Sequence, residues 1–66
     1  MTDQAIETLK QAIVISPYSA MAHYNLGSIY AVIGNYTEAR KEFLKVMEIE
    51  PGNSNARQML DKLSSR

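Results

Sequence analysis

The side chains that could carry out chemistry in this 66-residue chain are few. There is one histidine, His23, and no cysteine, and the acidic residues are scattered along the sequence. Nucleophilic catalysis needs a nucleophile, a base and an orienting group held together, and a metal site needs several ligands. Because His23 has no second histidine or cysteine to complete such a set, we interpret it as a packing or surface residue. The sequence predicts no catalytic residue, no metal and no cofactor, and therefore no enzyme.

Charge and hydropathy narrow the possible partners. Seven basic residues balance seven acidic ones, so no basic surplus is available for nucleic-acid phosphates or an anionic membrane. The longest apolar runs, such as residues 12–15, are much shorter than the roughly 20 residues of a membrane span. We expect a soluble, cytoplasmic chain that binds neither nucleic acid nor membrane. A chain of this size buries only about 60% of its unfolded surface, so its core depends on regular helix packing or on another chain.

An internal repeat in the sequence indicates the secondary structure that would position a binding site. Pro17 and Pro51 lie 34 residues apart, and apolar residues recur with the same offset. The matching pairs are Ala5 with Ala39, Leu9 with Phe43, Ala12 with Val46, Ile15 with Ile49, Ala22 with Ala56, and Leu26 with Leu60.

This repeat predicts an all-α fold of four helices over about 3–15, 20–33, 37–49 and 54–64. The short connections make neighbouring helices antiparallel, and no segment alternates as a strand does. Asp3, Thr37 and Ser54, with either Tyr18 or Ser19, are the expected helix starts. The "GN" at 34–35 predicts a turn in which glycine ends the second helix.

Residues 20–53 contain Leu26 with Gly27, Tyr30, Ala39, Phe43 and Pro51. With these residues the segment resembles one complete tetratricopeptide repeat. His23 departs from the family pattern, because it stands where an aromatic residue is usual. The resemblance implies one module over 1–66, with the second helix of a partial repeat at 3–17, a full repeat at 20–53 and a capping helix at 54–64. It rests on the signature residues Leu26, Gly27, Tyr30, Ala39, Phe43 and Pro51.

The resemblance also implies a function: a right-handed stack of helices whose concave groove holds a protein or peptide segment. It implies that Gly27 lets two helices approach closely, with Ala39 opposite. Groove contacts carried over by position are Met21, Tyr24, Asn25, Ser28, Ala31 and Val32 on the second helix and Asn55, Gln58, Met59 and Lys62 on the last. The alternative, that these residues are simply solvated, stays open.

A second class of function is self-association through the first helix. Ile6 and Val14 stand where the third helix has Arg40 and Glu48, and Ile13 is also apolar, so the first helix is apolar around more of its circumference. Terminal repeats of a stable array normally turn a polar face outward. We therefore expect that Ile6, Ile13 and Val14 could pair two chains as a homo-oligomer or helix-exchanged dimer. A longer parent protein whose missing helix covers this face is an equally open alternative.

Overall fold

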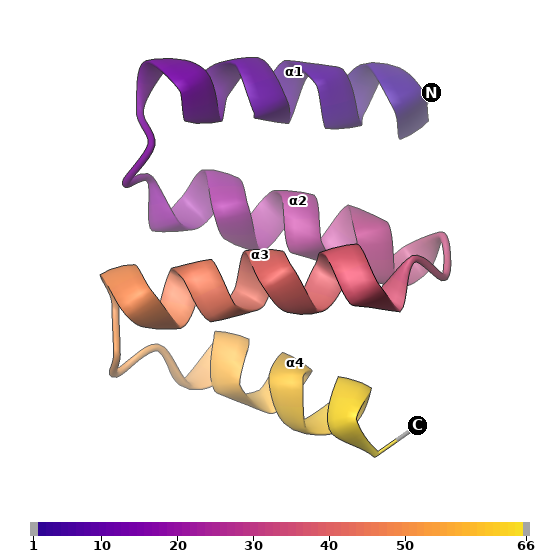
Figure 1. The fold of residues 1–66 in the computed structure, drawn as a ribbon, viewed down its shortest axis with the longest axis vertical. Coiled ribbons are helices and arrows are strands. Elements are labelled where there is room, and N and C mark those ends of the chain that lie inside the picture. Colours follow the sequence, from indigo (N-terminus) through magenta and orange to yellow (C-terminus); the bar gives the residue numbers. More distant parts are fainter. Residues whose placement is uncertain (1, 66) are drawn as a thin grey trace.

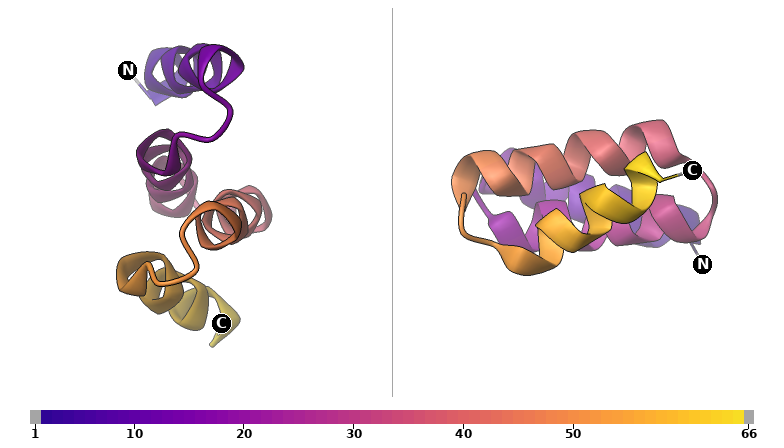
Figure 2. Two further views of the ribbon diagram at one scale, coloured as in Figure 1. Left: turned by 90° about the vertical axis from the view of Figure 1, so that its left-hand side faces the viewer. Right: turned by 90° about the horizontal axis from the view of Figure 1, so that it is seen from below.

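The computed structural model describes residues 2–65 as four helices: α1 (Thr2–Ile15), α2 (Ala20–Val32), α3 (Tyr36–Ile49) and α4 (Ser54–Ser64) (Figure 1). The all-α prediction is confirmed, and no predicted boundary is wrong by more than one residue. Successive helices run antiparallel, and α2 contacts both α1 and α3 while α4 packs on α3. Viewed along the helices, α2 and α4 lie on one side and α3 on the other (Figure 2).

Side-chain caps fix where α2 and α4 begin. Ser19 Oγ accepts a hydrogen bond from the Ala22 N–H at 3.2 Å, as expected for one of the two predicted starts of α2. Asn53 Oδ1 accepts from the Ala56 N–H at 2.9 Å. Helix α4 begins at Ser54 as predicted, but the side chain that caps it belongs to Asn53, the residue before it.

The other two predicted helix starts, Asp3 and Thr37, each lie one residue inside the observed helix. Asn35, not Thr37, precedes α3, and its side chain makes no cap hydrogen bond. Asp3 lies inside the first turn of α1, where its negative charge interacts favourably with the positive end of the helix dipole. The predicted turn at 34–35 is confirmed, because Gly34 has a φ of 85° and its N–H donates to the Ala31 carbonyl at 3.2 Å.

The core lies between α2, α3 and α4. Phe43, Ala39 and Val46 of α3 are completely buried, and Leu26 and Tyr30 of α2 pack with them. Four of the six signature residues thus belong to the core, Gly27 is buried beside it, and Pro51 is exposed in the turn after α3. The first helix contributes no fully buried residue. Three half-buried side chains of α1 pack against the core on the side that faces α2: Ile6, Leu9 and Ile13.

Candidate protein-binding surface

Gly27 sets how closely α2 and α3 cross. A Cβ atom built at this position would lie 3.1 Å from Cε1 and Cζ of Phe43 and 3.2 Å from Cβ of Glu42. Real Cβ contacts are rarely so short, so a side chain at position 27 would require its neighbours to shift by a few tenths of an ångström. The close approach is as expected, but Phe43 and Glu42 supply the nearest atoms, where Ala39 was expected.

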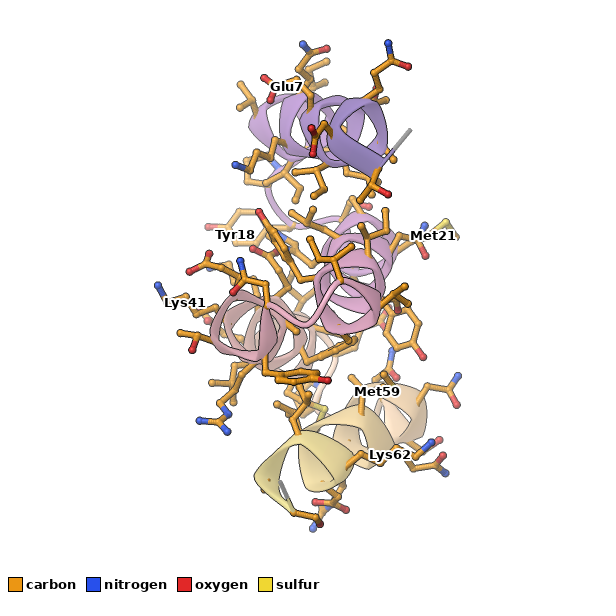
Figure 3. All side chains as sticks on the ribbon, turned by 90° about the vertical axis from the view of Figure 1, so that its right-hand side faces the viewer. Glu7, Tyr18, Met21, Lys41, Met59 and Lys62 are labelled. Atoms are coloured by element: carbon orange, nitrogen blue, oxygen red, sulfur yellow. The ribbon has the colours of Figure 1, made fainter. Side chains whose placement is uncertain are left out.

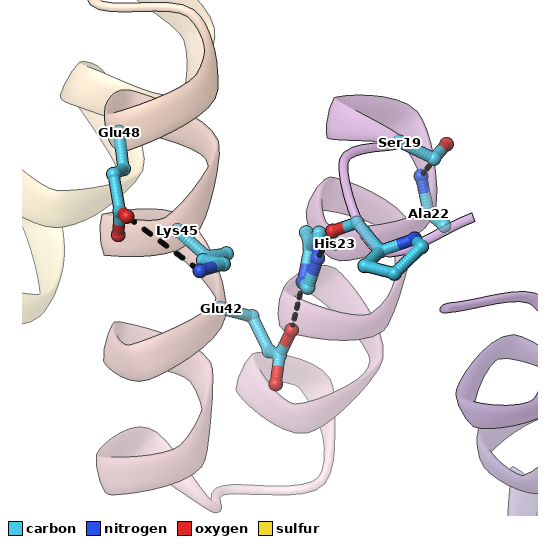
Figure 4. Close-up of polar contacts among 7 residues, drawn as sticks. Ser19, Ala22, His23, Glu42, Lys45 and Glu48 are labelled. Carbon is cyan, nitrogen blue, oxygen red and sulfur yellow. Dashed lines mark hydrogen bonds and ion pairs between the residues drawn. The ribbon is translucent and has the colours of Figure 1, made fainter. Parts of the chain in front are cut away.

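His23 ties three parts of the chain together from a buried position. Its Nδ1 lies 2.7 Å from Glu42 Oε1 and its Nε2 lies 2.8 Å from the Pro17 carbonyl oxygen (Figure 4). Both oxygens accept, so the ring donates to both only when each of its nitrogens carries hydrogen. The packing interpretation of His23 is confirmed. The sequence does not reveal its partner Glu42, which is 19 residues away.

A first hollow lies at the N-terminal end of α2. Met21 is 74% exposed beside it, and Tyr24 is held with its ring edge-on to Phe43, the centroids 5.4 Å apart. The hollow has a volume of about 250 Å³, and its lining residues are Ala20, Met21, Tyr24, Glu50, Asn53 and Asn55. Three of these residues were expected in the groove. Glu50 and Asn53 were not, because they lie in the α3–α4 loop, where no helical periodicity marks a face.

A second hollow lies at the opposite end of α2, beside α1. Its volume is about 350 Å³, and its lining residues are Thr2, Ala5, Ser28, Ile29, Val32 and Ile33. Ser28 and Val32 therefore line a different hollow from Met21 and Tyr24. The Ser28 hydroxyl donates to the Tyr24 carbonyl at 3.0 Å, so its proton is already used within the helix.

The remaining predicted groove residues are spread over α2 and α4. Asn25, Gln58 and Lys62 are exposed and have no side-chain hydrogen bond to any other residue of the described chain. Met59 is half-buried and packs against the core. Met21 projects on the opposite side of the helices from Lys41, which belongs to the charged outer surface of α3 (Figure 3). Polar side chains on α2 and α4 are thus exposed and unpaired, but none of Asn25, Gln58 and Lys62 lines the first hollow.

The three residues expected to drive self-association do not share one exposed face. Ile6 and Ile13 are half-buried and packed against the core, whereas Val14 is 79% exposed. The expectation of a single exposed apolar face is wrong in this respect, because α1 turns Ile6 and Ile13 inward. What remains at the C-terminal end of α1 is Val14 with Ile15, which is 82% exposed.

Charges elsewhere form ordinary surface pairs. Lys41 lies 3.2 Å from Glu38 and Lys45 lies 3.6 Å from Glu48, all on α3. Over residues 2–65, no three His, Cys, Asp or Glu side chains are grouped to hold a metal ion. None of the four helices has the length and apolar character needed to cross a membrane, as far as the described residues extend.

Four antiparallel helices that repeat with a 34-residue offset define an all-α helical repeat protein. Comparison with known families gives two matches: a TPR repeat over residues 2–34 and a tetratricopeptide repeat over residues 20–53. The chain belongs to the tetratricopeptide repeat family, whose repeats generally mediate protein–protein interaction. No curated protein matches it.

Proposed function

We propose that this chain is a non-enzymatic protein-binding module that holds an extended peptide segment against α2 and α4. The observation that carries the proposal is the first hollow, where exposed Met21 stands beside Tyr24 and the amide of Asn55. An apolar side chain of the ligand would fill the hollow, and asparagine amides would bond its backbone. An amide both donates and accepts, which matches the two needs of a peptide group.

Charge at the two ends of α4 would orient the segment. Glu50 lines the hollow at the start of α4, and its carboxylate accepts from Asn53 Nδ2 at 3.0 Å. Lys62 is exposed in the last turn of α4. A ligand that carries a basic group near the hollow and an acidic group toward Lys62 would be complementary to both.

Selection from a random peptide library, followed by titration with the selected peptide, tests this function. Met21→Ala removes exposed apolar surface without touching the core, and we expect it to weaken binding about fivefold or more, as for a contact at the edge of a hot spot. Asn25→Ala and Lys62→Glu should each weaken binding by a smaller factor, because exposed polar contacts contribute less.

Leu44→Ala is the matched control. Leu44 is 53% exposed on α3, so its truncation also removes apolar surface, but away from the first hollow. Equal affinities of the Met21→Ala variant, the Leu44→Ala variant and the parent chain would contradict the proposal, as would a selection that yields no saturable peptide.

Self-association is the second candidate, supported by the exposure of Val14 and Ile15. Sedimentation over a wide concentration range measures it directly. Val14→Glu is the informative variant, because Val14 is exposed and its replacement leaves the core intact. A monomer at all concentrations, unchanged by Val14→Glu, would exclude this candidate.

A further inference from the structure

His23 is the one polar side chain that is buried within residues 2–65, and both of its ring nitrogens face oxygen atoms of acceptor groups. Nδ1 lies 2.7 Å from a carboxylate oxygen of Glu42 on α3, and Nε2 lies 2.8 Å from the carbonyl oxygen of Pro17 in the α1–α2 loop (Figure 4). The His23 and Glu42 side chains are only 8% and 19% exposed, so water has little access to replace either contact. The protonation of the ring therefore decides how many of these contacts are hydrogen bonds.

Both contacts are satisfied when His23 carries one proton more than a neutral imidazole does. The extra proton sits on the ring, because imidazole is more basic than a carboxylate, and the imidazolium donates from both nitrogens. Without that proton the ring has one hydrogen for two acceptors. The Glu42 carboxylate is the stronger acceptor, because its hydrogen bond is charge-assisted, so the hydrogen stays on Nδ1. The lone pair of Nε2 then points at the Pro17 carbonyl oxygen, and that contact becomes repulsive.

Among the described residues, Glu42 is the one charged side chain in contact with the ring. Helix α2 itself has no Asp, Glu, Lys or Arg. On α3, Glu38 and Lys45 flank Glu42 by about one helical turn, and each is paired with an opposite charge on the same helix. On the side of α1, the ring centroid of Tyr18 lies 6.0 Å from Lys45 Nζ. The charged residues of α1 are all exposed: Asp3, Glu7 and Lys10. Glu42 is thus the group that holds the extra proton on His23.

The Pro17 contact ties α1 to the rest of the fold. Helix α1 has no fully buried residue, and its contacts with the core come from half-buried Ile6, Leu9 and Ile13. An element with so little buried surface has a low free energy of local opening, so one hydrogen bond at its end is a large fraction of that free energy. Helix α3 is held instead by side chains that are completely buried, such as Phe43. Loss of the Pro17 bond should therefore affect α1 first.

We propose that His23, Glu42 and the Pro17 carbonyl form a pH-sensitive switch that holds α1 on α2. While His23 carries its extra proton, both hydrogen bonds form. As the pH rises and the proton is lost, the Pro17 bond breaks, and α1 opens more often while the other helices stay packed. The stabilisation is thus present on the acidic side of the titration and lost on the alkaline side. Opening removes one wall of the second hollow and exposes the side of α2 that α1 covers.

NMR on the full chain tests the switch, because the chain has one histidine and its ring signals need no assignment. Long-range ¹H–¹⁵N spectra between about pH 5 and about pH 8, the range in which histidine changes charge, show which ring nitrogens carry hydrogen. We expect hydrogen on both nitrogens at the acidic end and on Nδ1 alone at the alkaline end. Amide hydrogen exchange of α1, corrected for the intrinsic effect of pH, should accelerate at least about fivefold, as for the loss of one hydrogen bond, and that of α3 should not.

Glu42→Gln separates the switch from simple packing. The glutamine amide can donate to Nδ1, so a neutral ring can carry its hydrogen on Nε2 and keep the bond to Pro17. We therefore expect the neutral ring to change tautomer in this variant, and hydrogen exchange of α1 to lose its pH response. Glu38→Gln is the matched control, because it removes the same charge one turn away on α3 without touching the ring, and it should keep the parent response.

Three outcomes would overturn the proposal. The first is hydrogen exchange in α1 that does not follow the charge of His23, or that accelerates equally in α3. The second is a neutral ring in the parent chain with its hydrogen on Nε2. The third is the same pH response in Glu42→Gln as in the parent chain, which would assign the response to another group. The switch involves no ligand, so failure of peptide binding at the first hollow would leave it intact.

Discussion

Gly27→Ala should change the stability of the fold through two opposing effects, a gain in helix propensity and a loss in packing. Alanine is favoured over glycine inside a helix by about 1 kcal/mol. The new methyl group would lie 3.1 Å from the Phe43 ring and 3.2 Å from Glu42 Cβ. Phe43 is completely buried and held edge-on by Tyr24, so its ring has little room to withdraw. The Glu42 contact is with an atom attached directly to the backbone, so relief requires α2 and α3 to separate.

The packing cost should exceed the gain in helix propensity. Overpacking a well-filled core costs about 1–3 kcal/mol, and taking the middle of that range leaves a net loss of about 1 kcal/mol. A loss of this size lowers the melting temperature of a domain of 60–100 residues by roughly 4–8 °C. Gly27→Ala should therefore destabilise the protein, whereas the same substitution at an uncrowded glycine within a helix would stabilise it.

Urea unfolding followed by circular dichroism measures the change, and two further variants isolate its cause. Gly52→Ala is the matched control, because a Cβ there meets nothing within 4 Å and should change stability by less than about 0.5 kcal/mol. Phe43→Leu removes the crowded ring atoms, so Gly27→Ala should cost about 1 kcal/mol less in that background. Stabilisation by Gly27→Ala in the parent chain, or strict additivity with Phe43→Leu, would refute the reasoning.

Three other substitutions test the remaining contacts by the same unfolding measurement. Glu42→Ala leaves Nδ1 of buried His23 without its partner and should cost about 1–3 kcal/mol, whereas Glu42→Gln keeps a side chain that can bond the ring and should cost less. Ser19→Ala and Asn53→Ala each remove a helix cap and should cost about 1 kcal/mol, while Asn53→Asp, which retains the acceptor, should restore most of the loss. Gly34→Ala should cost about 1–2 kcal/mol because φ is 85° there, although the added methyl meets no neighbour.

The fold was predictable because its pattern is repeated and periodic. The 34-residue offset and the apolar stripe of α3 locate every helix to within one residue. The caps were less predictable, because Asn53 and Ser54 are adjacent residues that both cap helices well. Only the position of the first helical turn decides between them, and sequence leaves that turn uncertain by a residue.

The candidate site was predictable only as a set of positions on α2. Helical spacing places Met21, Tyr24, Ser28 and Val32 on related faces, but it does not say which neighbours flank each end. The loop after α3 encloses the first two, and α1 encloses the last two, so one predicted groove becomes two hollows. Loop residues such as Glu50 have no period from which a face could be inferred.

Differences between repeat positions are informative only when the neighbouring helix is also compared. Ile6 matches Arg40, and this substitution suggested an exposed apolar face on α1. Ile6 instead packs against the core on the side of α2, a helix without Asp, Glu, Lys or Arg, whereas α3 also packs on α4, whose exposed residues include Arg57, Asp61 and Lys62. The side of α1 that stays exposed differs from its counterpart in another way: Gln4, Thr8 and Gln11 are uncharged, whereas the matching residues of α3 are charged and half-buried.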